Sequence, residues 1–206
     1  YKPESKKRIA LFAHWDTRPW ADNDPDEKNH NTPILGANDG ASGVGALLEI
    51  ARLVNQQQPE LGIDIILLDA EDYGAPQFYT GQHKEEFWCL GSQYWARNPH
   101  VQGYNARFGI LLDMVGGEGS VFTPDINKKV WKAAKKIGNG KTFMDGNGGF
   151  VTDDHLFINR LARIKTIDII PYNQEGDFTP TWHTVNDNME HIDKNTLKAV
   201  GQTVLE

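Results

Sequence analysis

The stretch IDIILLDAEDYG, residues 63–74, decides the fold that this sequence predicts. Its first half is an apolar run rich in β-branched residues, which is typical of a buried β-strand. Its second half places three carboxylates within four positions, at Asp69, Glu71 and Asp72. Buried carboxylates that lie close together are costly unless a positive charge joins them. The stretch therefore predicts a buried strand whose carboxyl end lies beside a positively charged partner.

The composition sets the class of protein. The chain has 206 residues, of which 39% are hydrophobic and 24% charged, and this is typical of a globular domain with a substantial core. No apolar run approaches the roughly 20 residues that span a bilayer. The formal net charge of −7 disfavours nucleic acid as the main partner. Cys89 is the only cysteine, which excludes an intrachain disulfide and leaves the cellular compartment open.

Strand-like and helix-like segments alternate on both sides of the opening stretch. We expect strands over residues 8–16, 63–69, 108–116 and 164–172, and helices over residues 41–58, 92–98, 125–138, 153–161 and 193–205. Such alternation predicts a three-layer α/β/α sandwich with a mostly parallel, mixed central sheet. No internal repeat or low-complexity linker divides the sequence, so we expect one domain over residues 1–206.

Chemically capable residues follow the ends of the predicted strands, where active sites of such folds lie. These positions, with the loop before the first helix, hold His14, Asp16, Asp39, Asp69, Glu71, Asp72, Asp113 and His183. Imidazoles and carboxylates from separate loops suit zinc, whose 2+ charge also explains the clustered acids. Taken alone, each aspartate is more often a helix cap or a surface acid than a ligand, and His14 is also consistent with a hydrogen-bonded core histidine. Four other histidines lie in polar sequence and are expected to be solvated: His30, His83, His100 and His191.

Six segments, in order, resemble the successive motifs of the zinc-dependent aminopeptidase clan. More narrowly, they resemble its glutaminyl cyclase branch, the glutaminyl-peptide cyclotransferases of the animal and bacterial zinc type. The segments read AHWDTRP, GANDGASGVGALLEIAR, LLDAED, LLDMVG, TDDHLFINR and WHTVNDNMEHID. The resemblance covers nearly the whole chain, and GANDGASG and WHTVNDN are its most specific parts. It implies a zinc aminopeptidase-like catalytic domain that normally has additional sequence upstream.

The resemblance implies a metal-binding role for three residues. Asp39, Asp72 and His183 match the zinc ligands, and one zinc ion is expected. Glu71 matches the general acid/base. Because Asp72 stands where the family more often has Glu, the alternative in which Glu71 binds the metal stays open.

His14 and Asp113 match the ligands that complete a second metal site in the peptidases. In the cyclases that site is generally empty, and the Asp113 equivalent serves in a catalytic hydrogen-bond network. Whether His14 binds a metal is therefore open.

Three features favour the cyclase branch over the peptidases. Trp182 directly precedes His183, a long segment bearing Trp88 follows the paired acids, and Asp153 opens the sequence Asp-Asp-His. Ordinary core packing of Trp182 and loop anchoring by Trp88 are the alternatives. The resemblance implies that Asp113 and Asp153 form an acidic relay with Glu71. The animal enzymes have a histidine where this chain has Asp168, which departs from their relay.

We therefore expect an acyltransferase that converts N-terminal glutaminyl residues of peptides to pyroglutamate and releases ammonia. Trp88 and Trp182 would bind the substrate, and Glu71, Asp113 and Asp153 would serve catalysis. The alternative is a zinc aminopeptidase that removes N-terminal residues. A degenerate binding module is disfavoured by the intact set of acids and His183. We also expect a monomer that is exported to the periplasm or anchored to a membrane through a signal not contained in this sequence.

Overall fold

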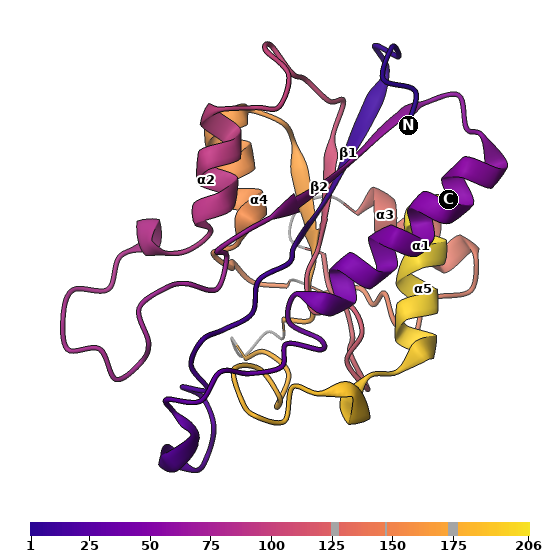
Figure 1. The fold of residues 1–206 in the computed structure, drawn as a ribbon. Helices are drawn as coiled ribbons and strands as arrows, with labels where there is room; N and C mark the ends of the chain where they lie inside the picture. The colour runs from indigo at the N-terminus through magenta and orange to yellow at the C-terminus, as the bar shows by residue number, and fades with distance from the viewer. Residues whose placement is uncertain (125–127, 147, 173–176) are drawn as a thin grey trace.

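One parallel sheet forms the centre of the molecule (Figure 1). In this computed structural model, residues 1–124, 128–146, 148–172 and 177–206 are described. Their four strands lie in the order β2-β1-β3-β4, and every neighbouring pair is parallel. The strands are β1 (Arg8–His14), β2 (Gly62–Leu68), β3 (Gly109–Leu112) and β4 (Thr166–Ile169). All four carboxyl ends therefore meet at one edge of the sheet.

The central position of β1 follows from its unbroken apolar sequence. Leu11 and Ala13 pack into the core on one face, while Ala10 and Phe12 pack into the core on the other. All four side chains are buried, as expected for a parallel strand covered on both faces.

Strand β2 corrects one expectation drawn from the opening stretch. It pairs only with β1 and forms an edge of the described sheet. Ile65 and Ile66 are half-buried, and Leu67 is 43% exposed. An apolar run of this length does not by itself distinguish an edge strand from a central one, because the distinction depends on which strands pair with it.

Helices cover both faces of the sheet (Figure 1). On one face lie α1 (Ala41–Gln57), α3 (Lys129–Lys136) and α5 (Lys194–Leu205), whose buried residues share a core with β1 and β3. On the other face lie α2 (Leu90–Arg97) and α4 (Asp154–Phe157), which continues into a π-helical turn over Ile158–Ala162. The predicted three-layer α/β/α sandwich is confirmed.

The ends of several elements differ from the sequence expectations. The described part of the helix expected over 125–138 spans Lys129–Lys136, and its expected first residue, Asp125, lies outside the described residues. Helix α2 begins at Leu90, two residues before the expected cap Ser92. By contrast, Asp193 caps α5 as predicted, because its side chain accepts the Asn195 N–H. Among the described residues, the helices are too short or too polar to cross a membrane.

Candidate active site

The predicted site residues meet at the carboxyl edge of the sheet. His14 is the last residue of β1, Glu71 and Asp72 follow β2, and Asp113 follows β3. Asp39 lies two residues before α1, and His183 comes from the long segment between β4 and α5. All six side chains are at least nine-tenths buried. Parallel pairing thus brings together residues that are up to 169 positions apart in the sequence.

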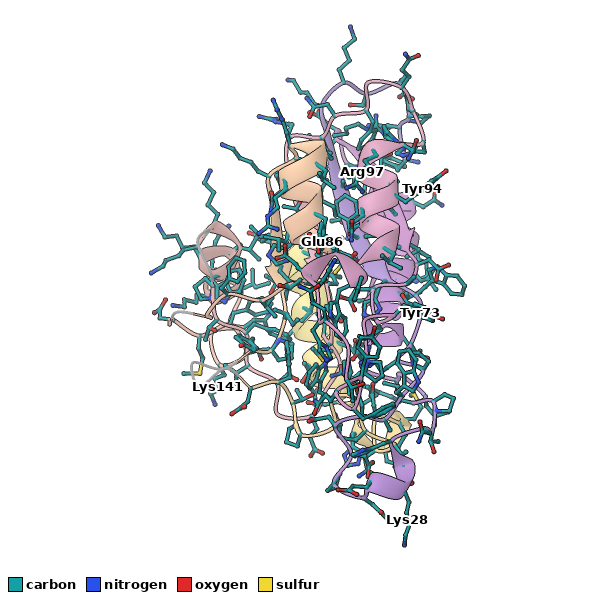
Figure 2. All side chains as sticks on the ribbon, turned by 90° about the vertical axis from the view of Figure 1, so that its left-hand side faces the viewer. Lys28, Tyr73, Glu86, Tyr94, Arg97 and Lys141 are labelled. Atoms are coloured by element: carbon teal, nitrogen blue, oxygen red, sulfur yellow. The ribbon has the colours of Figure 1, made fainter. Side chains whose placement is uncertain are left out.

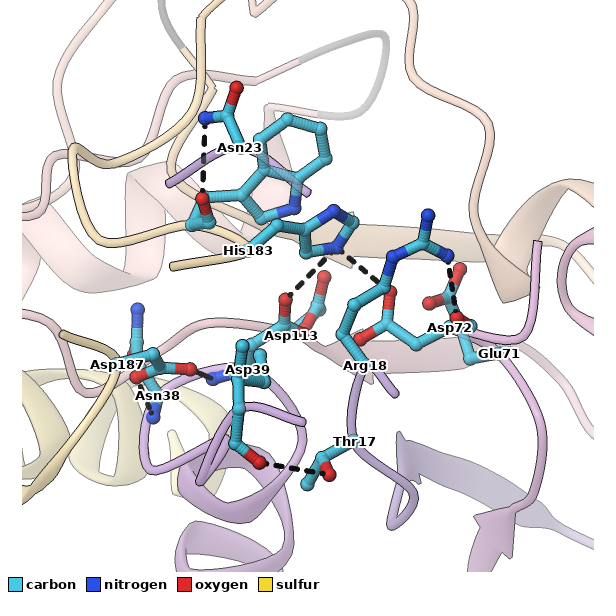
Figure 3. Close-up of polar contacts among 12 residues, drawn as sticks. Thr17, Arg18, Asn23, Asn38, Asp39, Glu71, Asp72, Asp113, His183 and Asp187 are labelled. Carbon is cyan, nitrogen blue, oxygen red and sulfur yellow. Dashed lines mark hydrogen bonds and ion pairs between the residues drawn. The ribbon is translucent and has the colours of Figure 1, made fainter. Parts of the chain in front are cut away.

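Asp39 lies between two imidazoles. Its Oδ2 is 3.5 Å from His183 Nε2, which is also 3.0 Å from Asp72 Oδ1 (Figure 3). Its Oδ1 is 3.2 Å from His14 Nε2, which is also 3.0 Å from Asp113 Oδ1. The predicted zinc ligands Asp39, Asp72 and His183 are therefore adjacent. His14, Asp39 and Asp72 likewise offer ligand atoms within 4.8 Å of one another.

The donor set fits a divalent cation. Asp39 Oδ2 and Asp72 Oδ2 are buried without a hydrogen-bond partner among the described residues. Burial and the charge of Asp72 raise the pKa of Asp39 to about 7, as expected for crowded buried carboxylates. Although burial opposes it, the charge of Asp72 raises the pKa of His183 to about 9. Imidazole and carboxylate ligands of this kind suit zinc.

Two further carboxylates fix the backbone that carries the predicted metal ligands. Asp187 accepts the N–H groups of Asn38 and Asp39 at 2.8 and 3.0 Å. Asp16 accepts the N–H groups of Glu71 and Asp72, each at 3.1 Å. We call these two arrangements the carboxylate clamps. Each clamp holds a segment that bears a predicted metal ligand through its main chain and makes no hydrogen bond to the side chain of that ligand.

A buried guanidinium supports the other side of the site. Arg18 is 1% exposed and donates to the carbonyl oxygens of Asp72 and Gly74, both at 2.7 Å. It also forms an ion pair with Asp22, whose Oδ1 lies 3.5 Å from His183 Nδ1. A carboxylate on the far ring nitrogen orients a metal-binding histidine. Sequence analysis missed Arg18 and Asp22, and their spacing of four residues within the polar loop AHWDTRPWAD was the available signal.

Glu71 lies close to other carboxylates. The residue is 7% exposed and borders the cavity. Burial first, and then the charges of Asp72 and Asp153, raise its pKa well above the ordinary value. The described hydrogen bond to this carboxylate comes from the Cys89 thiol, whose Sγ is 3.1 Å from Oε1.

The expected acidic relay is only partly visible. Asp153 lies near Glu71, but its Oδ1 accepts the N–H of Asp154 and thereby caps α4. The Asp113 carboxylate contacts His14 rather than Glu71 within the described part of the chain. Asp168 lies near Asp153 and is 3.4 Å from His155 Nδ1. The catalytic roles of Asp113 and Asp153 stay predictions.

A cavity of about 470 Å³ opens beside these groups, and two indoles form part of its wall. The Trp182 ring stacks on His183 with centroids 3.9 Å apart, and Trp88 lies nearly parallel to the same imidazole at 6.2 Å. Both rings are half-buried. The structure therefore places both predicted substrate-binding residues at the cavity, and their role in binding stays a prediction.

The histidines expected to be solvated differ among themselves. His83 and His100 are exposed, whereas His30 is half-buried with its Nε2 2.8 Å from the Asp24 carbonyl oxygen. His191 is also half-buried. None of the four belongs to the described metal-ligand cluster around Asp39.

A parallel α/β sandwich with this cluster at the strand ends defines a metal-dependent enzyme scaffold. The model of peptidase family M28 matches residues 1–206, and the chain belongs to this family.

A solved Bacteroides thetaiotaomicron glutaminyl cyclase with bound N-acetylhistamine is 82% identical to this chain. The match has a TM-score of 0.97 and covers 100% of this chain and 73% of that one. A structure described as a leucine aminopeptidase precursor from the same organism is also 82% identical, with a TM-score of 0.96 and coverage of 100% and 72%. The bovine glutaminyl-peptide cyclotransferase is 25% identical over 95% of this chain, which spans 60% of the bovine protein's length.

Proposed function

We propose that this chain carries the active site of a glutaminyl-peptide cyclotransferase, which converts an N-terminal glutaminyl residue to pyroglutamate and releases ammonia. The observation that carries the proposal is the cavity in which Glu71 and two indoles, Trp88 and Trp182, surround one face of the metal-ligand cluster. The high identity to the Bacteroides thetaiotaomicron glutaminyl cyclase supports the same reaction.

The cavity suits one side chain and one amine. The Trp88 and Trp182 rings offer flat apolar surface to the methylene groups of a glutamine side chain. This wall would fold the substrate so that its α-amine lies against its own side-chain carboxamide. Since nucleophile and electrophile belong to one molecule, positioning supplies much of the rate enhancement.

Asp39, Asp72 and His183 would hold one zinc ion. When bound, this zinc supplies Lewis-acid polarisation of the side-chain carbonyl. Glu71 would accept a proton from the α-amine as its nitrogen forms a bond to the carboxamide carbon. Glu71 would then return that proton to the amide nitrogen, whose bond to carbon breaks as ammonia leaves. Its raised pKa brings the carboxyl nearer to the range in which such transfer is efficient.

One observation favours a second candidate function. Asp39 presents one oxygen to His183 and the other to His14, which also contacts Asp113. This arrangement offers ligands for two metal ions, as an aminopeptidase would require. The relative described as a leucine aminopeptidase precursor is consistent with it.

Two assays separate the candidates. The protein is incubated with a Gln-initiated peptide and, separately, with a Leu-initiated aminopeptidase substrate. Ammonia release from the first without cleavage of the second supports the cyclotransferase, and the reverse result overturns it. Metal analysis of the same preparation should give about one zinc per chain, whereas two would favour the aminopeptidase.

A further inference from the structure

The steps of the proposed reaction do not involve the buried thiol of Cys89. Cys89 is 0% exposed and immediately precedes α2. Burial and the charge of Glu71 raise the pKa of the thiol, so it keeps its hydrogen. A buried, protonated thiol is a poor nucleophile but remains a hydrogen-bond donor.

The start of α2 is fastened to the segment that carries the acids. Successive N–H groups of Cys89, Leu90 and Gly91 donate to the carbonyl oxygens of Glu71, Ala70 and Asp69, at 2.9, 3.0 and 2.8 Å. The N–H groups of a helix start need such acceptors, because the helix itself offers none. The turn after β2 and the start of α2 therefore form one rigid unit.

Within this unit, Cys89 makes two hydrogen bonds to Glu71. Its N–H binds the Glu71 carbonyl oxygen, and its Sγ lies 3.1 Å from Glu71 Oε1. The backbone hydrogen bond fixes the position of the Glu71 main chain, and the thiol hydrogen bond fixes the position of its Oε1 atom. The Glu71 carboxylate that borders the cavity is therefore restricted in its rotation.

We propose that Cys89 is a positioning residue, which holds the Glu71 carboxylate in the orientation for proton transfer through a hydrogen bond from its thiol to Oε1. This inference rests on the proposed cyclotransferase function. A carboxylate that has lost this bond would sample more rotamers, so fewer of its conformers would reach the substrate amine.

Steady-state kinetics test the proposal. Cys89→Ala removes the donor, and kcat should fall about tenfold while KM changes less than about twofold. Cys89→Ser restores an O–H donor of similar shape and should return kcat to within about threefold of the parent value. Zinc content should stay unchanged in both variants. An active parent whose kcat is unaffected by Cys89→Ala overturns the inference.

A control separates positioning from loosening of α2. Trp95 lies on the same helix, is buried, packs edge-to-face against Phe12 at 5.3 Å, and is not among the described residues that line the cavity beside Glu71. Trp95→Phe should lower the melting temperature and leave kcat within about twofold of the parent value. A fall in kcat equal to that of Cys89→Ala would assign the effect to helix packing and overturn the inference.

A spectroscopic test needs no turnover. Because Cys89 is the only cysteine in the sequence, its S–H stretching band in the infrared has a single source. Removing the acceptor by Glu71→Ala should shift this band to the frequency of a thiol without a hydrogen bond. An unshifted band overturns the inference. A parent protein that releases no ammonia overturns the proposed function instead, and the band shift still decides the hydrogen bond.

Discussion

At the scale of single residues, the paired acids Glu71 and Asp72 contact different partners. The backbones of both are fixed by Asp16, so their side chains diverge from a common anchor. The Asp72 side chain faces His183, whereas the Glu71 side chain faces Cys89 and the cavity. This geometry favours Asp72 as the metal ligand and Glu71 as the group that moves protons.

Replacing Glu71 with glutamine tests this division. Glu71→Gln keeps the shape of the side chain but removes its ability to take up a proton. We expect kcat to fall by about 10² to 10⁴, while metal analysis still gives the zinc content of the parent. Asp72→Asn is the matched comparison, and it should lose zinc as well as activity. Loss of zinc from Glu71→Gln would show that the two roles are reversed.

At the scale of elements, we predict opposite effects on stability for glycine-to-alanine changes in two helices. A Cβ at Gly91, in α2, would lie 2.2 Å from the Asp69 carbonyl oxygen. Gly91→Ala should therefore destabilise the fold by about 1–3 kcal/mol and lower kcat, because the acid-bearing turn must shift. A Cβ at Gly201, in α5, meets no atom within 4 Å. Gly201→Ala should stabilise the fold by about 0.5–1 kcal/mol and leave kcat unchanged.

Thermal unfolding and steady-state assays of the two variants check this pair. Equal changes in melting temperature for both would contradict the tight packing of Gly91 against the turn. Figure 2 shows Tyr94, on the same helix, extending outward, whereas the close approach at Gly91 is to the backbone of Asp69.

The pairing of β1 with β2 carries a pH-dependent ion pair. Asp64 accepts hydrogen bonds from Arg8 Nη2 at 2.7 Å and from the Tyr104 hydroxyl at 2.6 Å. Burial alone would raise the pKa of Asp64, but the hydrogen bonds and the Arg8 charge lower it overall. A carboxyl with a lowered folded-state pKa stabilises the fold above its unfolded pKa of about 3.9, and this contribution is lost as the pH falls below that value.

Asp64→Asn should therefore unfold at a lower temperature than the parent at pH 7. The difference in melting temperature should shrink as the pH is lowered below about 4, where the parent also loses the charged pair. Calorimetry of both proteins at a series of pH values measures this difference in melting temperature. A difference that stays constant down to pH 3 would show that the charge of Asp64 does not stabilise the fold.

At the scale of the whole molecule, a bound zinc would join segments far apart in the sequence. Asp39, Asp72 and His183 belong to three different loops. Because the metal binds the folded chain, chelation should lower the melting temperature by several degrees. Asp72→Asn should unfold at nearly the same temperature with and without chelator. Equal responses of parent and variant to the chelator would contradict this ligand set.

The layered fold and the metal-ligand cluster follow from local sequence patterns. Alternating strand and helix signals predict the sandwich, and the acids after residue 68 and before residue 41 predict where ligands meet. The edge position of β2 does not follow, because strand order is a property of pairing. The contacts of Arg18 and Cys89 were also missed, since they are made to partners 54 and 18 positions away. The hydrophobic periodicity of a sequence does not indicate contacts between residues so far apart.

The clamp formed by Asp187 has a consequence for the order of folding. It joins Asp187 to the backbone of Asn38 and Asp39 across 149 and 148 positions of the chain. Contacts of such sequence separation carry a large loop-closure entropy and form late. During synthesis, the loop that bears Asp39 therefore stays without its clamp until nearly the whole of this sequence has been made. The backbone contacts that hold Asp39 are therefore complete only once Asp187 has been made and the fold has formed.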